Sequence, residues 1–492
     1  MGILFEHAVV VTGDGGPVLR DAHLLVENGH ITALGEGRLV AEPGKPDGQA
    51  NVCGHESVCG HESVCGHESV CGHESVCGHE SVCGHESVCG HERDRRKEWF
   101  GLHERIDASG QVLLPAFFNT HTHVPMTLLR NYADDMDLQT WLFTKVFPVE
   151  DRLDGEAVFW GTQLGLMEML AGGTAGFTDM YYFCDETAQA VLDSGMRMLL
   201  TRGLTGDETT GDFTNDVRLA DSKALHGRWH GAGKGRIRVG LGPHAVYTCS
   251  PAYLSAVAEL GCALKATVHI HLDETLREHM ECLAKYGKTP VRHCADLGLF
   301  AGPAIAAHCV HVTEEDIGIL AARNVVMAHN PRSNLKLASG IAPVPAARRA
   351  GVRVALGTDG ASSNNTLDMW SEMGLAALLH KGATLDPLAI TATEALDMAT
   401  RVGASAMGFE MSGVLKTGLK ADLLMADMSG PHWQPVHNVV SAVVYSGRSS
   451  DVRLTMVDGK ILYRNGEFLT IDAEKVRHGI ASTVEKVFGG KR

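Results

Sequence analysis

Histidines and acids that could hold a metal ion stand at the ends of several strand-like apolar runs. His121 and His123 lie two residues apart in the segment Asn119–His123, and alternate residues of a strand point to the same side. His271 ends a second run, and Asp359 follows a third within the sequence Gly-Thr-Asp-Gly. Imidazole and carboxylate groups from separate strand ends can bind a divalent ion and leave one position open for water. The pattern therefore predicts a metal site.

Two further side chains could move protons at such a site. Glu274 lies three residues after the histidine of the second run, where it can reach a substrate without occupying the metal. His308 ends the next run and can orient a water molecule. The helix dipole alone also favours an acid in a first helical turn, so Glu274 has a structural explanation besides the catalytic one. Among the other histidines, we expect His269 to pack within the fold and His279 and His293 to lie on solvated helix faces.

The elements that must position these residues alternate between strand-like and helical patterns. Eight apolar runs follow one another, and each is followed by enough chain for a helix, as a closed (β/α)8 barrel requires. We therefore predict an α/β protein with a (β/α)8 TIM barrel over residues 114–409. The eight runs are Gln111–Pro115, Ala175–Thr178, Arg197–Thr201, Ile237–Leu241, Thr267–His271, Ala304–His308, Val325–His329 and Val352–Leu356.

Short strand patterns at both ends of the chain predict a smaller flanking domain. They are separated by glycine-rich turns near the N-terminus, and they return late in the chain, for example in the apolar run Val439–Val444. A helical pattern covers Ala473–Phe488. We predict a small β-sandwich with a C-terminal helix, formed by residues 1–51, 94–113 and 410–492.

Residues 52–93 are seven copies of the hexapeptide Val-Cys-Gly-His-Glu-Ser, the last of which ends in arginine. Cysteine and histidine in each copy could sequester soft metal ions, so a non-catalytic metal buffer is a rival function. The segment has little to bury and a glycine in every copy, and we favour a disordered passenger in a surface loop. The other six cysteines form no C-x-x-C pair, which is typical of reduced thiols rather than of a disulfide framework.

The overall composition argues against two classes of partner. The formal net charge is −16, whereas a protein that binds nucleic acid regardless of sequence needs a basic face. No segment approaches the roughly 18 consecutive apolar residues of a membrane span. The N-terminus lacks the basic and apolar regions of a signal peptide, so we expect a cytoplasmic protein.

The metal-site motifs resemble those of the amidohydrolase superfamily in order and spacing, and within it the S-adenosylhomocysteine/5′-methylthioadenosine deaminase family. The resemblance covers nearly all of the chain outside the repeat. It rests on His121–Arg130, Trp141–Glu150, Leu199–Leu204, Gly242–His244, His271–Thr275, Ala307–Cys309, Ser333–Pro345, Gly357–Asn365 and Gly418–Asp422. Superfamily members with two metals have a carbamylated lysine at the end of the fourth strand, but here that strand ends Gly240–His244. The resemblance therefore implies one divalent ion, zinc by preference, with the ligands His121, His123, His271 and Asp359.

The same resemblance implies roles in substrate binding. Glu150 would hold the ribose hydroxyls, and His244 would contact the nucleoside. Arg202 and Arg218 would reach the amino-acid tail of the longer substrate, Arg218 only after a short insertion around Gly206–Gly211 is allowed for.

Hydrolytic deamination of a 6-aminopurine needs a nucleophile at C6, a proton for N1 and a proton for the departing ammonia. A bound zinc ion would supply hydroxide near neutral pH. Asp359, at once a ligand and a base, would accept the water proton, Glu274 would protonate N1, and His308 would orient the water. Asp359 and Glu274 would thus also contact the substrate.

We predict an enzyme that converts the 6-amino group of S-adenosylhomocysteine and/or 5′-methylthioadenosine to a 6-oxo group and releases ammonia. The alternative is a guanine deaminase or a triazine chlorohydrolase of the same branch. A free base or a triazine offers no ribose or carboxylate to Glu150, Arg202 and His244, which disfavours this alternative. The sequence leaves the preferred nucleoside and a homo-oligomeric state open.

Overall fold

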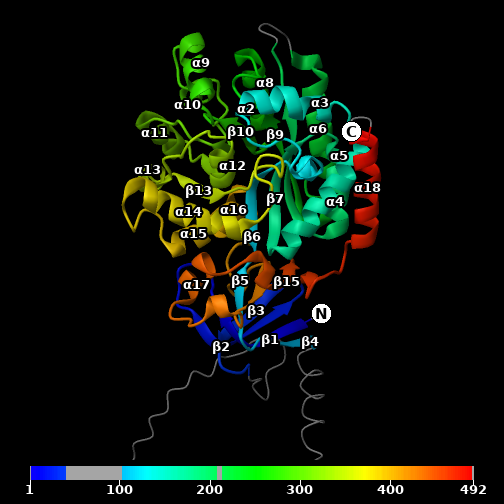
Figure 1. The fold of residues 1–492 in the computed structure, drawn as a ribbon, viewed down its shortest axis with the longest axis vertical. Helices are drawn as coiled ribbons and strands as arrows, with labels where there is room; N and C mark the ends of the chain where they lie inside the picture. Colours follow the sequence, from blue (N-terminus) through cyan, green and yellow to red (C-terminus); the bar gives the residue numbers. More distant parts are fainter. Residues whose placement is uncertain (1, 40–101, 208–212, 490–492) are drawn as a thin grey trace, which may run out of the picture.

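The computed structural model describes residues 2–39, 102–207 and 213–489. The repeat at residues 52–93, predicted to be a passenger insert, lies outside this described part. Two sheets form the framework of the described residues, one of eight strands and one of nine, and they lie in separate halves of the molecule (Figure 1). No helix of the described segments is long and apolar enough to cross a membrane.

The eight-stranded sheet confirms the predicted (β/α)8 barrel. Its strands are β6 (Phe117–Thr122), β7 (Thr174–Tyr181), β8 (Arg197–Leu204), β9 (Ile237–Pro243), β10 (Val268–Leu272), β11 (Ala304–His308), β12 (Val326–His329) and β13 (Arg353–Leu356). Each strand is hydrogen-bonded to the next in chain order, and every such pair is parallel. Side chains join the first strand to the last: Thr120 Oγ1 donates to Leu356 O at 2.7 Å, and Asn119 Oδ1 accepts from the Thr358 amide at 2.9 Å.

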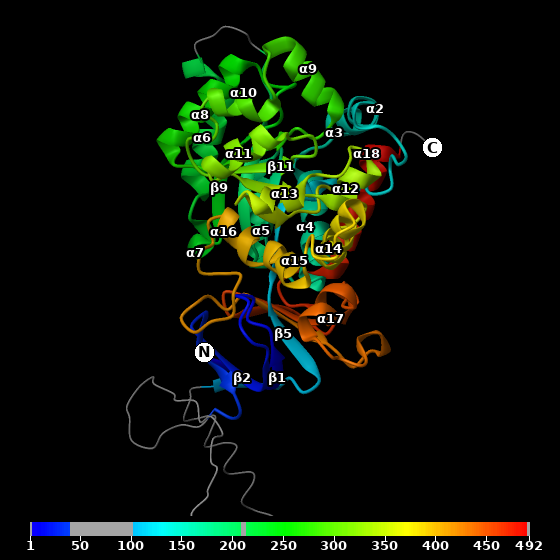
Figure 2. The same cartoon turned by 90° about the vertical axis from the view of Figure 1, so that its left-hand side faces the viewer.

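Helices connect successive strands and cover the outside of the barrel (Figures 1 and 2). Between β6 and β7 lie η1 (Val124–Leu129), α2 (Leu138–Trp141), η2 (Leu142–Val146), α3 (Phe147–Glu150) and α4 (Gly155–Ala171). The connections up to β10 contain α5 (Cys184–Ser194), η3 (Phe213–Asn215), α6 (Val217–Trp229), α7 (Ala232–Gly235) and α8 (Pro251–Leu264). Those up to β13 contain α9 (Leu276–Tyr286), α10 (Pro290–Asp296), α11 (Glu314–Ala322), α12 (Pro331–Lys336) and α13 (Val344–Arg349), and after β13 follow α14 (Met369–Thr384), α15 (Ala392–Ala399) and α16 (Arg401–Ala406).

Polar N-cap residues fix where barrel helices begin. Asp154 before α4, Ser250 before α8 and Thr391 before α15 each accept a hydrogen bond from an amide in the first helical turn. These amides have no partner within the helix itself. The caps therefore set the point at which each helix begins. Ser250 does so for the loop that follows β9, and loops after barrel strands form the mouth of a barrel.

The nine-stranded sheet is mixed and contains both ends of the chain, as predicted. Its strands are β1 (Gly2–Val10), β2 (Leu19–Glu27), β3 (His30–Glu36), β4 (Leu102–Asp107), β5 (Gln111–Pro115), β14 (Leu423–Asp427), β15 (Val452–Val457), β16 (Lys460–Arg464) and β17 (Glu467–Phe468). The order is β17-β16-β15-β14-β5-β1-β2-β3, and β4 pairs with β1. In Figure 1 the early strands (blue) and the late strands (orange) lie together below the barrel. The domain boundaries at residues 113 and 410 stay predictions.

One predicted barrel strand belongs to the other sheet. The run Gln111–Pro115, predicted as the first barrel strand, is β5, which pairs antiparallel with β14 and parallel with β1. The barrel begins at Phe117 instead. Two strands follow one another with only Ala116 between them, and both are buried. Hydrophobicity therefore did not separate them.

A second strand prediction was also wrong. The run Val439–Val444 forms helix α17 (Val439–Tyr445), and its N-cap Asn438 accepts from the Ser441 amide at 2.9 Å. A short apolar run fits a buried strand or a buried helix equally well. The asparagine cap was the local signal that favoured the helix.

The two halves of the molecule contact each other through a buried ion pair and the last helix. Arg197, the first residue of β8, donates two hydrogen bonds to Asp422 at 2.7 and 2.9 Å. The amino ends of the barrel strands therefore face the mixed sheet, and the carboxyl ends lie at the far side. Helix α18 (Ala473–Phe488) confirms the predicted C-terminal helix. It runs along the barrel beside α4 (Figure 1), and Gly479 lies against the indole of Trp160.

Candidate active site

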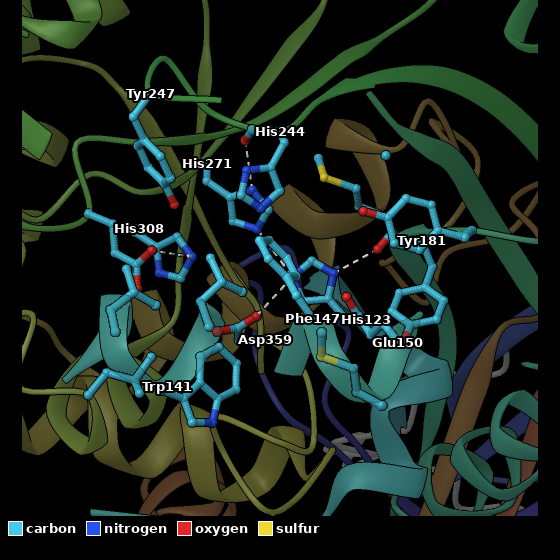
Figure 3. A pocket seen from close by; sticks show the side chains of 18 residues that line it. His123, Trp141, Phe147, Glu150, Tyr181, His244, Tyr247, His271, His308 and Asp359 are labelled. Atoms are coloured by element: carbon cyan, nitrogen blue, oxygen red, sulfur yellow. Dashed lines mark hydrogen bonds and ion pairs between the residues drawn. The ribbon is translucent and has the colours of Figure 1, made fainter. Parts of the chain in front are cut away.

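The structure places the four predicted metal ligands at the carboxyl ends of three barrel strands, and Figure 3 shows His123, His271 and Asp359 facing one another. His121 and His123 come from the end of β6, His271 from β10, and Asp359 from the loop after β13. His123 Nε2 lies 3.1 Å from His271 Nε2. Asp359 Oδ1 lies 3.3 Å from Nε2 of both His121 and His123.

Backbone carbonyls fix the proton positions of two of these rings. His123 Nδ1 lies 2.7 Å from the Met180 carbonyl, and His271 Nδ1 lies 2.8 Å from the His244 carbonyl. A carbonyl only accepts, so each Nδ1 carries the proton and donates it. When the ring is neutral, which is the form that binds a metal, its Nε2 is an unprotonated acceptor that faces the other ring. At His123 a metal would compete with a proton, because the opposing effect of burial is outweighed by Asp359, which raises the pKa of His123 to about 9.

A buried relay fixes His121 in the same way. Thr201 Oγ1 donates to the Asp179 carbonyl at 2.7 Å, so at 3.3 Å it accepts from His269 Nδ1. Nε2 of neutral His269 then accepts from His121 Nδ1 at 2.8 Å, and burial keeps the pKa of His269 well below its usual value. His121 Nε2 is buried and has no hydrogen-bond partner among the described residues. We expected His269 only to pack; it orients a predicted ligand, a role that metal-binding histidines commonly require of a neighbour.

The donor atoms fit a divalent cation. Donor atoms of His121, His123 and Asp359 lie within 4.8 Å of one another, as do those of His121, His271 and His308. Imidazole nitrogens and a carboxylate oxygen in such groups suit a divalent cation. The carboxylate of Asp359 is held for this task, because Ser333 Oγ and Ser363 Oγ donate to Oδ2 at 2.6 and 2.7 Å. Its other oxygen, Oδ1, accepts from the Gly360 amide at 2.8 Å and faces the imidazoles.

Glu274 and His308 face the same point from β10 and β11. Glu274 Oε2 lies 3.8 Å from His308 Nε2, and His308 Nδ1 donates to Asn334 Oδ1 at 2.8 Å. Glu274 is only 4% exposed, and burial raises its pKa. A carboxyl group that keeps its proton more readily is better suited to act as a general acid near neutral pH.

A cavity opens beside these residues. Its polar lining consists of His123, His271, Glu274, His308, Asp359, His244 and Glu150, all of which except Glu274 are labelled in Figure 3. The remaining surface is largely apolar and aromatic. Its lining residues are Met126, Leu138, Trp141, Leu142, Phe147, Met180, Tyr181, Tyr182, Tyr247 and Leu337.

Glu150 and His244 line the cavity as predicted substrate contacts should. Glu150 Oε1 is buried without a hydrogen-bond partner in the described part of the chain. Burial raises the pKa of Glu150, and the neighbouring Tyr181 hydroxyl lowers it in part. Burial lowers the pKa of His244 to about 4, so its imidazole is neutral near pH 7. Besides the metal cluster, the cavity thus offers one carboxyl group and one neutral imidazole as polar contacts.

The family that this architecture represents follows from the comparison with known proteins. The Amidohydrolase family matches residues 112–462, which include the barrel and every residue of the site. The chain belongs to the amidohydrolase family. A relative from Syntrophomonas wolfei, named 5-methylthioadenosine/S-adenosylhomocysteine deaminase, is 48% identical over 386 residues, which are 78% of this chain and 89% of the relative.

Solved structures agree with the family assignment. The crystal structure of an adenosine deaminase from Xanthomonas campestris with bound zinc superposes with a TM-score of 0.82 at 31% identity, covering 99% of this chain and 98% of that one. An atrazine chlorohydrolase from Arthrobacter aurescens, solved with zinc, has a TM-score of 0.79 at 23% identity and covers 98% of this chain and 100% of its own. At that identity the second likeness concerns the fold alone.

The two predicted tail-binding arginines of this amidohydrolase do not line the cavity. Arg202, at the end of β8, is next to the lining residue Gly203, and its guanidinium lies 3.8 Å from Asp221. Arg218 donates to Asp216 and to the Thr205 carbonyl. Both guanidinium groups thus already have partners within the chain, and their role stays a prediction.

Two histidines that we expected on solvated helix faces are buried. His279 Nδ1 donates to the Asp273 carboxylate at 2.9 Å. His293 stacks on Tyr286 with a ring separation of 4.2 Å. Sequence reasoning also gave no role to Trp141, Phe147, Tyr181 and Tyr247, which line the cavity. Trp141 and Phe147 lie within a motif that already carried the family resemblance, and this was the available signal.

Proposed function

We propose that this amidohydrolase is a metal-dependent deaminase that hydrolyses the 6-amino group of S-adenosylhomocysteine and/or 5′-methylthioadenosine. The product is the 6-oxo, or inosyl, compound, and ammonia is released. The proposal rests above all on one observation, the buried carboxyl of Glu274 facing the same cavity as the three-histidine, one-aspartate cluster. The name of the Syntrophomonas wolfei relative supports the substrate class.

One divalent ion would be held by the cluster. Its ligands would be His121, His123, His271 and Asp359. When bound there, the ion supplies a Lewis acid that makes a water molecule nucleophilic near neutral pH. Zinc is our first choice, because three imidazoles and one carboxylate suit it and because the adenosine deaminase that is 31% identical was solved with bound zinc.

The protein's own residues would manage the protons. Asp359 accepts the proton of the attacking water, Glu274 donates its proton to N1 of the purine, and His308 orients the water. The new C6–O bond leaves a hydroxyl and an amino group on C6. The proton on Asp359 passes to the amino group, the C6–N bond breaks, and ammonia leaves. The hydroxyl proton returns to Glu274 as the C6 carbonyl forms.

The rest of the cavity would bind the nucleoside. Glu150 has a buried oxygen that could accept from both ribose hydroxyls, and neutral His244 could contact the nucleoside without adding charge. Arg202 and Arg218 would serve the amino-acid tail, for which they must exchange their present acidic neighbours. A cytoplasmic location is part of this proposal.

A substrate panel tests the function. Purified protein is assayed by the loss of adenosine absorbance on S-adenosylhomocysteine, 5′-methylthioadenosine and adenosine. The alternative substrates are guanine, assayed by the release of ammonia, and a chlorinated triazine, assayed by the release of chloride. Metal content is measured on the same sample, and on protein lacking residues 52–93. Turnover only of guanine or the triazine would favour the alternative enzymes. Metal bound only when the repeat is present, without any turnover, would favour the metal buffer.

A further inference from the structure

Glu278 holds the turn that carries Glu274. Glu278 lies in the first turn of α9 and is only 3% exposed. One oxygen of its carboxyl accepts from the Asp273 amide at 3.0 Å, and the other accepts from the Glu274 amide at 2.9 Å. Both oxygens are therefore used on two consecutive peptide groups, the second of which belongs to the proposed general acid.

The local sequence alone would predict a different contact. Thr275-x-x-Glu278 has the pattern of a capping box, in which the acid binds the amide of the threonine. The same pattern at α15 behaves in this way, since Glu394 Oε2 accepts from the Thr391 amide at 2.8 Å. At α9 the threonine still caps the helix, accepting from the Glu278 amide at 3.2 Å. The Glu278 carboxyl, however, binds the two amides that precede the threonine. It therefore holds the loop before the helix.

The turn so held also determines where His308 lies. Asp273 has a left-handed backbone, with φ of 54°, and its carbonyl accepts from the amides of Val310 and His311 at 2.9 and 3.0 Å. These two residues directly follow the turn at His308. The peptide group between Asp273 and Glu274 thus links the loop of Glu274 to the loop of His308. Glu278 fixes this peptide group by accepting a hydrogen bond from its N–H.

We propose that Glu278 is a positioning residue for the deamination reaction. It sets the Glu274 carboxyl relative to His308 and the metal cluster, and it does not line the substrate cavity. This inference rests on the proposed function. It assigns to Glu278 an effect on the chemical step, which a residue that only stabilises helix α9 would not have.

The substitution Glu278→Gln tests the proposal. A glutamine side chain has only one acceptor oxygen. One of the two hydrogen bonds from the backbone amides is therefore lost, and the side-chain NH₂ group faces a peptide N–H. We expect kcat to fall by about 10- to 100-fold, because a displacement of about 1 Å can cost about a hundredfold. KM for 5′-methylthioadenosine should stay within about threefold, as expected for an interaction that acts mainly in the transition state. Bound metal should be unchanged.

Glu394→Gln is the matched control. It makes the same change at the same position of a capping box, far from the cavity, so it should lower stability without changing kcat. Glu278→Asp keeps both oxygens on a shorter stem and should give an intermediate kcat. Wild-type kcat in Glu278→Gln, or an equal fall of kcat in both glutamine variants, would overturn the proposal.

Amide hydrogen exchange provides a readout besides activity. The amides of residues 273 and 274 should exchange faster in Glu278→Gln than in the wild type, and should be unaffected in Glu394→Gln. Unchanged exchange in Glu278→Gln would also overturn the proposal. If the wild type deaminated no nucleoside, the proposed function would fail, and the exchange result would still decide whether Glu278 holds this turn.

Discussion

Replacing Glu150 by glutamine should lower kcat/KM by the same factor for every ribose-containing substrate. Glu150 Oε1 is buried and has no hydrogen-bond partner among the described residues, although the Tyr181 hydroxyl is near enough to lower the pKa of Glu150 in part. Hydrogen bonds to a charged acceptor contribute about 1.5–3 kcal/mol, against about 0.5–1.5 kcal/mol for neutral pairs. The substitution should then weaken each of two hydroxyl contacts by about 1 kcal/mol, or about 2 kcal/mol in total. This corresponds to a fall in kcat/KM of about 30-fold.

The assay compares Glu150→Gln with the wild type on 5′-methylthioadenosine, S-adenosylhomocysteine and free adenine at pH 8. Burial raises the pKa of Glu150, and the alkaline pH therefore favours the ionised carboxyl. The two nucleosides should lose kcat/KM equally, and any slow reaction of adenine should be unaffected because adenine has no ribose. Unchanged kcat/KM on both nucleosides would refute the ribose assignment and would favour a free base or a triazine as substrate.

Four further predictions concern the other parts of the site. Glu274→Gln should lower kcat by about 10²–10⁴-fold with normal metal content, since the amide keeps the shape but has no acidic proton; retained kcat with raised KM would make Glu274 a binding residue. His121→Ala protein should bind less metal and lose deamination, as should chelated wild type; full activity in the metal-free variant would contradict the metal assignment. Arg202→Met and Arg218→Met should each lower kcat/KM for S-adenosylhomocysteine by about thirtyfold and leave kcat/KM for 5′-methylthioadenosine unchanged. The expected loss is at the low end for a charged pair because both side chains are partly exposed. Equal losses on both nucleosides would exclude a role in binding the tail. Deleting residues 52–93 should leave kcat/KM within about threefold, because loop length changes stability little; a hundredfold loss in folded protein would show that the repeat takes part.

The barrel was predictable because its strands are apolar runs separated by helix-length segments. Seven of the eight runs fall on barrel strands. The first failed at Gln111–Pro115, where β5 and β6 follow one another directly and both are buried. The strand prediction for Val439–Val444 was wrong for a related reason. Over six residues hydrophobicity carries no usable period, and the Asn438 cap outweighed the β propensity of valine.

The site was predictable in its ligands and less so in the groups that orient them. His121, His123, His271 and Asp359 follow strand ends, so topology alone brings them to one mouth. The relay through His269 and Thr201 depends on which side chains of the alternate strands β6, β8 and β10 meet inside the barrel. That depends on the stagger between parallel strands, which residue spacing does not give. His279 was misjudged because its helix turns it toward Asp273 rather than toward solvent.

Backbone strain at the site explains why its turns could not be predicted although its residues could. Asp273, His308 and Asp359 have φ of 54°, 72° and 64°, a left-handed conformation that costs a residue with a side chain about 1–2 kcal/mol. Surrounding hydrogen bonds can maintain such strain. Here Glu278 holds Asp273, and the Asp359 amide donates to the His121 carbonyl at 2.9 Å. Glycine is the usual signal for such a turn, but glycine has no carboxylate or imidazole. The chemistry therefore requires a side chain where the backbone alone would favour glycine, and the residue types that indicate the site give no indication of the turn.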